Sequence, residues 1–88
     1  MIGTREIIWT STARADYLSI KRSDKEKAKR IDLLLEHTLR SQSKGFGAPV
    51  PLKGALEGCY SRRIDSINRL VYYCPEEAIV VVACKYQQ

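Results

Sequence analysis

The chain has 88 residues and a mass of 10.0 kDa, which is enough for one small hydrophobic core and excludes large multi-layer enzyme folds. Its 44% hydrophobic and 28% charged residues are typical of a globular protein, and no apolar run approaches the roughly 20 residues that a membrane helix needs. Lysine and arginine outnumber aspartate and glutamate by 15 to 10, and this net charge of +5 favours a polyanionic partner, nucleic acid before a membrane surface.

The amino terminus lacks the layout of a secretory signal, and the three cysteines indicate no export either. Cys59, Cys74 and Cys84 are odd in number and form no Cys-x-x-Cys pair, and no histidine lies near them in the sequence. Neither a disulfide framework nor a zinc site is therefore predicted. We expect a single cytoplasmic domain over residues 1–88, with reduced thiols and with no metal or cofactor.

Residues 6–10 are β-branched and aromatic and predict a first strand. A helix capped by Ser11 or Thr12 follows, through residue 22. Ser23 and Glu26 then match a capping box for a second helix, whose apolar stripe has helical spacing. The stripe comprises Ala28, Ile31, Leu34, Leu35, Thr38 and Leu39.

The second helix begins with a group of basic residues that allows two interpretations. Nucleic-acid contact is one, and an ordinary solvated helix face is the other, which we prefer. His37 has no second ligand or carboxylate near it in the sequence, so a structural role is favoured. The basic residues are Lys25, Lys27, Lys29 and Arg30.

Serine, glycine and proline gather in residues 41–51 and predict a connector. Residues 60–64, 68–74 and 78–86 then predict three strands, the last two joined across 75–77 as a hairpin. The fold class is therefore α+β in the order β-α-α-β-β-β. The two helices should cover one face of an antiparallel sheet of about four strands and leave the opposite face free.

Alternation along these strands sorts the arginines between the two faces of the sheet. Arg63 shares a face with Ser61, whereas Arg62 shares the other with Tyr60. Arg69 and Tyr73 share a face in the next strand.

Several motifs in the second half of the chain occur in a familiar order. PLKGALEGCYSRRI is followed by NRLVYY and then by ACKY, and matching residue types extend upstream to Trp9 without a gap. In this arrangement the chain resembles the YoeB/Txe family of bacterial toxins, which belongs to the RelE superfamily. The upstream matches are Trp9, Asp16, Tyr17, Leu18 and Asp24.

The resemblance implies a toxin of a type II toxin–antitoxin pair that acts as a ribosome-dependent endoribonuclease, or mRNA interferase, in the ribosomal A site. In such cleavage the RNA 2′-hydroxyl attacks the adjacent phosphate, so no protein nucleophile and no metal is needed. The implied partners are the ribosome with its mRNA, a YefM/Phd-like antitoxin with an acidic C-terminal segment, and a second copy in a homodimer. No membrane partner is implied.

The same resemblance assigns roles to individual residues. Arg69 and Arg63 stand at catalytic arginine positions, where a guanidinium can fork onto phosphate oxygens. The positions expected to contact RNA are Lys53, Arg62, Lys85 and Tyr86.

Three catalytic positions differ from the family pattern. The general base is replaced by Val50, the general acid by Gln87, and the closing aromatic residue by Gln88. Valine and glutamine do not titrate, and each lost acid or base typically costs about 10² to 10⁴ in rate. Two interpretations stay open. The first is a rewired endoribonuclease, in which Glu57 could substitute as the base, and the second is a protein that binds the ribosome or captures an antitoxin without cutting. Gyrase inhibition of the ParE type is disfavoured.

Overall fold

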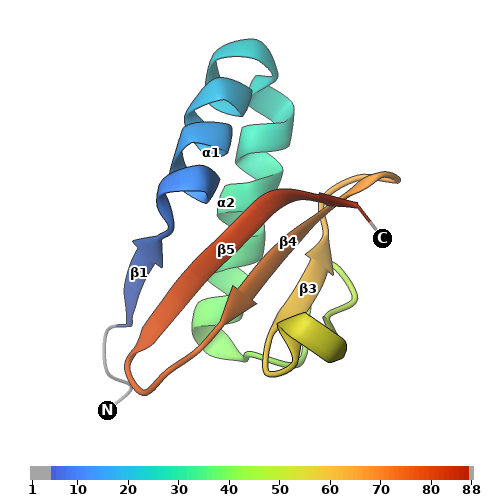
Figure 1. Ribbon diagram of the computed structural model, residues 1–88. Coiled ribbons are helices and arrows are strands. Elements are labelled where there is room, and N and C mark those ends of the chain that lie inside the picture. Colours follow the sequence, from blue (N-terminus) through green and yellow to red (C-terminus); the bar gives the residue numbers. More distant parts are fainter. Residues whose placement is uncertain (1–4, 88) are drawn as a thin grey trace.

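Two helices and a five-stranded sheet make up the described part of the chain, residues 5–87, in this computed structural model (Figure 1). The order confirms the expected α+β fold and adds a two-residue strand and a short 3₁₀ turn in the connector. In sequence, the elements are β1 (Glu6–Trp9), α1 (Ser11–Ser23), α2 (Lys25–Arg40), β2 (Val50–Pro51), η1 (Gly54–Leu56), β3 (Tyr60–Arg63), β4 (Asn68–Tyr73) and β5 (Ala78–Gln87).

The sheet has the order β1-β5-β4-β3-β2 and is mixed. β1 pairs in parallel with β5, while β2, β3, β4 and β5 pair antiparallel. The expectation was an antiparallel sheet of about four strands. The sheet instead has five strands, and its β1–β5 pairing is parallel. Alternating residue types show which side chains share a face of a strand, but they do not show which strand lies next to it. The sequence near β1 therefore could not indicate its parallel pairing with β5 at the other end of the chain.

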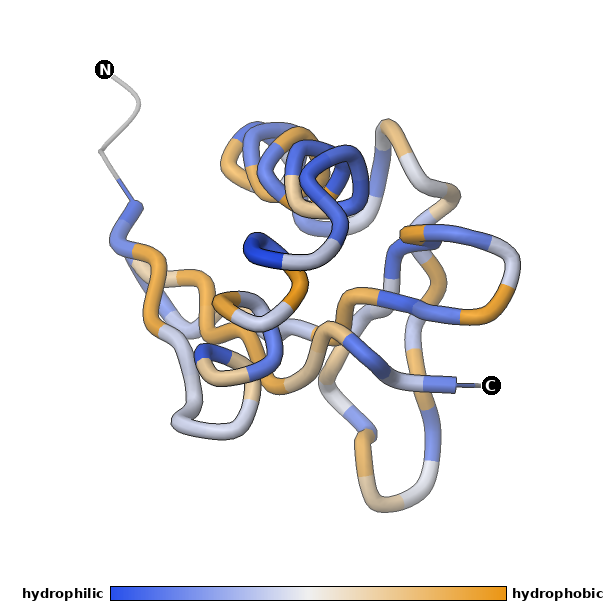
Figure 2. The backbone as a smooth tube through the Cα atoms, turned by 90° about the horizontal axis from the view of Figure 1, so that it is seen from above, coloured by the Kyte–Doolittle hydropathy of each residue, from blue (hydrophilic) through white to orange (hydrophobic). Residues whose placement is uncertain are grey.

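Both helices lie on one side of the sheet (Figure 2). The cap of α1 is Thr10, one residue before the expected Ser11 or Thr12. Its side-chain oxygen accepts a hydrogen bond from the Ala13 amide at 3.2 Å and donates one to the Val82 carbonyl at 3.2 Å. This single hydroxyl thus satisfies a free amide of the first turn and ties α1 to β5.

The cap of α2 also differs from the prediction. Ser23 is the last residue of α1 and its hydroxyl donates to the Ser19 carbonyl, so it cannot begin a capping box. Asp24, with an extended φ of −150°, separates the helices, and its carboxylate accepts from the Lys27 amide at 3.1 Å. A carboxylate suits this position because the amino end of a helix is partially positive.

The core lies between the helices and the sheet. Ile31 and Leu34 from α2 meet Leu70, Tyr72 and other strand residues, and all four of these side chains are fully buried. Burial of each such side chain contributes roughly 1.5 to 3 kcal/mol. Residues that pair across strands share a face, so the row from Val50 through Ser61 and Val71 to Ala83 lies on the side away from the helices.

Part of that second face is covered, which corrects the expectation of a free face. Ser61 and Val71 are fully buried, whereas Val50 and Tyr73 are about two-fifths exposed. The face is therefore a shaped surface, and its exposed part lies toward its margins.

Candidate functional site

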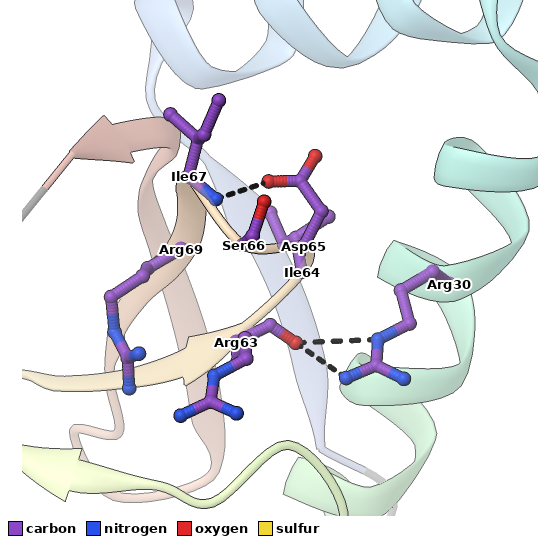
Figure 3. A pocket seen from close by; sticks show the side chains of 7 residues that line it. All are labelled: Arg30, Arg63, Ile64, Asp65, Ser66, Ile67 and Arg69. Atoms are coloured by element: carbon purple, nitrogen blue, oxygen red, sulfur yellow. Dashed lines mark hydrogen bonds between the residues drawn. The ribbon is translucent and has the colours of Figure 1, made fainter.

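A groove of about 640 Å³ opens at the end of β3 and β4, next to α2. Strand ends and the turn between them supply most of its wall, and α2 supplies one side chain (Figure 3). Polar groups exceed apolar ones in the lining, and three of the side chains are guanidinium groups. The groove is lined by Arg30, Arg63, Ile64, Asp65, Ser66, Ile67 and Arg69.

Arg63 and Arg69 are direct cross-strand partners on the face away from the helices. Directly opposed residues have Cβ atoms about 5 Å apart, and like charges at that distance repel. Burial lowers the pKa of Arg69 below its usual value, and the charge of Arg63 lowers that pKa further. Neither guanidinium forms an ion pair with an acidic side chain of residues 5–87. This uncompensated pair can bind an anion.

The Arg69 side chain is held in place, because its Nε donates a 2.7 Å hydrogen bond to the buried hydroxyl of Ser61. Tyr86 is the next partner of Arg69, on β5, and Val50 is the partner of Ser61, on β2. The sheet thus places four expected site positions on one face, in two adjacent rows.

Arg30 belongs to the same groove, although a solvated helix face was the preferred interpretation of its part of α2 and nucleic-acid contact the alternative. Its Nε and Nη2 donate to the backbone carbonyl of Arg63, at 3.2 and 2.8 Å (Figure 3). Its guanidinium carbon also lies 4.1 Å from the ring centre of Phe46. These partners are 33 and 16 residues away in the sequence, so no local pattern could have identified the contact.

Asp65 is the one carboxylate in the groove wall, and it organises the β3–β4 turn. Its Oδ1 accepts from the amides of Ile67 and Asn68 at 2.8 and 2.6 Å, and Oδ2 pairs with Lys27 Nζ at 3.2 Å. The pKa of Asp65 lies well below its ordinary value, chiefly because the Asn68 amide donates to the carboxylate; burial raises the pKa and offsets part of this effect. A carboxylate that gives up its negative charge so reluctantly is a poor general base at neutral pH.

Replacing Asp65 with alanine should destabilise the fold by about 1 kcal/mol, because two turn amides lose their acceptor. The native pKa is depressed, so this stabilisation is present above the unfolded pKa of about 4 and is lost as the pH falls through the native pKa. The difference in unfolding free energy between the wild type and D65A should therefore shrink from about pH 5 downward in urea titrations. S66A, the neighbouring control, should match the wild type; a difference that stays constant with pH would contradict the assignment.

Lys53 and Glu57 lie away from the arginines. Both line a second hollow beside η1, with Tyr60 and Cys59. Neither residue lines the arginine groove. An RNA contact by Lys53 therefore needs a substrate that extends beyond the groove, and Glu57 is not placed to act as a base for a phosphate bound in the groove.

Lys85 turns toward α1, where its Nζ lies 3.8 Å from Asp16 Oδ1. The cause is an irregularity in β5: Arg69 pairs with Tyr86 and Val71 with Ala83, so two steps along β4 match three along β5. Such bulges re-aim side chains. Gln87 pairs with Asn68 at the end of β5, and the Gln88 position lies outside the described residues.

Arg62 is fully buried, so the expected RNA contact by this residue is not supported. Its Nε donates to the Tyr72 hydroxyl at 2.9 Å and its Nη1 to the Phe46 carbonyl at 2.7 Å. Nη2 donates to the carbonyls of Ser41 and Lys44 at 2.5 and 2.9 Å. Alternation correctly put Arg62 and Arg63 on opposite faces of the sheet. It could not show that Arg62 is covered, because the covering loop, residues 41–47, comes from elsewhere in the sequence.

This loop packs closely against β3. Gly47 has φ of +89°, its carbonyl accepts from the Arg63 amide at 2.7 Å, and an added Cβ would lie 2.5 Å from a Leu34 methyl group. Only glycine fits such a position. His37 stacks on Phe46 with ring centres 5.4 Å apart, which agrees with the structural role expected for it.

Within residues 5–87, no three His, Cys, Asp or Glu side chains lie close enough together to hold a metal ion. No described helix is sufficiently long and apolar to cross a membrane. The three cysteines are free thiols.

Comparisons with known proteins agree with the geometry. A family model described as the YoeB-like toxin of bacterial type II toxin-antitoxin systems matches residues 9–88. Toxin YoeB of Streptomyces coelicolor is 42% identical over 80 residues, covering 91% of this chain and 95% of the relative, and Toxin YoeB of Escherichia coli K12 is 38% identical over 81 residues, covering 92% and 96%.

Solved structures from Staphylococcus aureus are similar as well. A YoeB dimer superposes with a TM-score of 0.92 at 36% identity, and the toxin of a heterotetrameric YoeB–YefM toxin–antitoxin complex with a TM-score of 0.89 at 36% identity. Both alignments cover 98% of this chain and 100% of the other. The fold, the paired arginines and these matches together show that the chain belongs to the YoeB-like family of toxins from bacterial type II toxin–antitoxin systems.

Proposed function

We propose that this toxin is a ribosome-dependent endoribonuclease that cuts mRNA in the A site with arginines rather than titrating groups. The observation that carries the proposal is the cross-strand pair of Arg63 and Arg69, two adjacent cations without an acidic partner in the described chain. Because a cluster of this kind is electrostatically unfavourable when empty, a bound phosphate would stabilise it.

In the proposed reaction the RNA 2′-oxygen forms a bond to phosphorus and the bond from phosphorus to the 5′-oxygen breaks, which leaves a 2′,3′-cyclic phosphate. Arg63 and Arg69 would stabilise the extra negative charge of the crowded phosphorane. The 2′-hydroxyl proton would pass to water, and the leaving 5′-oxygen would take a proton from water. In this proposal neither transfer uses a side chain of residues 5–87, since Asp65 is a poor base and positions 50 and 87 hold valine and glutamine.

The lack of a general acid and base supports slow cleavage and also favours a second candidate function. A toxin with an intact phosphate site but no proton-transfer groups could occupy the ribosome, or engage an antitoxin, without cutting. Both candidates require the arginine pair, and they differ only in whether the phosphodiester bond breaks.

Primer extension on an mRNA translated in the presence of the protein separates the two candidates. An endoribonuclease is expected to give 3′ ends at fixed positions within codons. Their absence at a protein concentration that saturates the ribosomes would favour binding alone. The double variant V50E/Q87H restores a carboxylate and an imidazole, and should raise the cleavage rate at least tenfold, since each positioned group typically contributes about 10² to 10⁴. An unchanged rate would contradict the placement of the site; the control is V82E, a carboxylate placed elsewhere on β5.

We further propose an acidic antitoxin segment as the partner of the same surface, because complementary charge would both steer its association and neutralise the arginine pair. The S. aureus complex joins a YoeB toxin to a YefM antitoxin. A homodimer is the other proposed assembly, as in the S. aureus YoeB dimer.

A further inference from the structure

We infer that Arg30 is a third RNA-binding arginine, which binds a phosphate next to the one held by Arg63 and Arg69. The inference rests on the proposed RNA-binding function and extends it to a substrate footprint of at least two phosphates. Arg30 reaches the groove from α2, whereas the other two arginines come from β3 and β4 (Figure 3).

The orientation of Arg30 is fixed before any ligand binds. Two of its N–H groups converge on one acceptor, the Arg63 carbonyl, and its guanidinium lies over the ring of Phe46. A guanidinium has five N–H donors, so three are left for a ligand; it makes no other hydrogen bond to residues 5–87. A donor held in this way loses little conformational entropy on binding.

Phe46 is itself held in place, which makes the support of Arg30 rigid. The Phe46 carbonyl accepts from the buried Arg62, and its ring stacks on His37. Arg30 and His37 are seven residues apart on α2, so both lie on the same helix face. The buried Arg62 therefore positions the half-buried Arg30 through a single aromatic residue.

The charge of Arg30 is also uncompensated. Asp65, the carboxylate that lines the same groove, is engaged by two turn amides and by Lys27, and no ion pair joins Arg30 to an acidic side chain of the described chain. Three such cations around one groove match the charge of a phosphate chain. A lysine could not replace Arg30, because it lacks both the fork and the planar stacking surface.

The test uses a fluorescein-labelled hexaribonucleotide with 2′-O-methyl groups, which cannot be cut by 2′-oxygen attack. Its affinity is measured by fluorescence anisotropy over a range of salt concentrations. For R30Q the slope of log K against log salt should fall in magnitude by about 0.7, the value for one lost single-strand phosphate contact. Glutamine retains a donor for the Arg63 carbonyl, so the melting temperature should stay close to that of the wild type.

The matched control is K29Q, which removes the same charge from the neighbouring position. Lys29 is not among the residues that line the groove, and it forms an exposed pair with Glu26 at 3.6 Å. Its variant should bind with the wild-type slope. Equal slopes for R30Q and K29Q, or no binding of the probe by the wild type, would overturn the inference. Binding with the predicted slopes but without cleavage on the ribosome would support the inference and contradict the proposed nuclease activity alone.

Discussion

Replacing Arg62 with methionine is expected to lower the free energy of unfolding by about 3 kcal/mol or more, because three loop carbonyls and the Tyr72 hydroxyl lose a charged donor in the interior. For a domain of this size the melting temperature should fall by roughly 12–24 °C. Methionine fills a similar volume, so the loss reflects hydrogen bonding more than a cavity.

R63M is the matched control, since Arg63 is the next residue along β3 but is exposed and makes no side-chain hydrogen bond within the described chain. Its removal also relieves the repulsion of Arg69, so its melting temperature should equal or exceed that of the wild type. Calorimetry or circular dichroism melting measures both variants. Similar melting temperatures for R62M and R63M would show that the loop 41–47 does not depend on the buried guanidinium.

Replacing Arg69 with alanine is expected to reduce cleavage of ribosome-bound mRNA by about 10² to 10³, the usual effect of losing one preorganised donor to a developing oxyanion. The melting temperature should change by only a few degrees: the lost hydrogen bond to Ser61 costs about 1 kcal/mol, while the repulsion by Arg63 disappears. Primer extension measures the cleavage, in the wild-type chain and in the V50E/Q87H background.

R69K separates charge from geometry in the same assay. Lysine keeps the positive charge but cannot donate to Ser61 and to two phosphate oxygens at once, so its rate should lie between those of R69A and the wild type. A large fall in the melting temperature of R69A would make Arg69 a structural residue, and an unchanged cleavage rate would remove it from the proposed mechanism.

The sequence predicted most of the fold because its elements carry strong periodic signals. Both helices and the four longer strands lie where apolar spacing and turn residues placed them. The missed features depend on neighbours rather than on local pattern: β2 has only two residues, one of them Pro51, and β1 pairs with a strand about 70 residues away. The error at Ser23 arose because α1 continues one residue beyond its predicted end at residue 22.

The sequence could predict only those site residues whose position follows from their own strand. It could not predict the roles that depend on contacts with distant segments. Arg63 and Arg69 were expected at catalytic positions on successive strands, and the structure makes them direct cross-strand partners. The role of Arg62 depended on a loop that covers it, and the role of Arg30 on a carbonyl from another element, so neither could follow from spacing. The side chain of Lys85 is directed toward α1 by a bulge in β5, a register change of one residue that the residue types alone rarely indicate.

The parallel pairing of β1 with β5 bears on the order in which the fold can form during synthesis. β5 is made last among the described elements, yet it is an interior strand between β1 and β4. Until it emerges from the translating ribosome, β1 has no partner and the hydrophobic layer under α1 is incomplete. Contacts of such long sequence separation form late and slowly. A nascent chain without β5 therefore cannot complete its core, and the sheet face on which Arg69 pairs with Tyr86 can form only after this strand has been made.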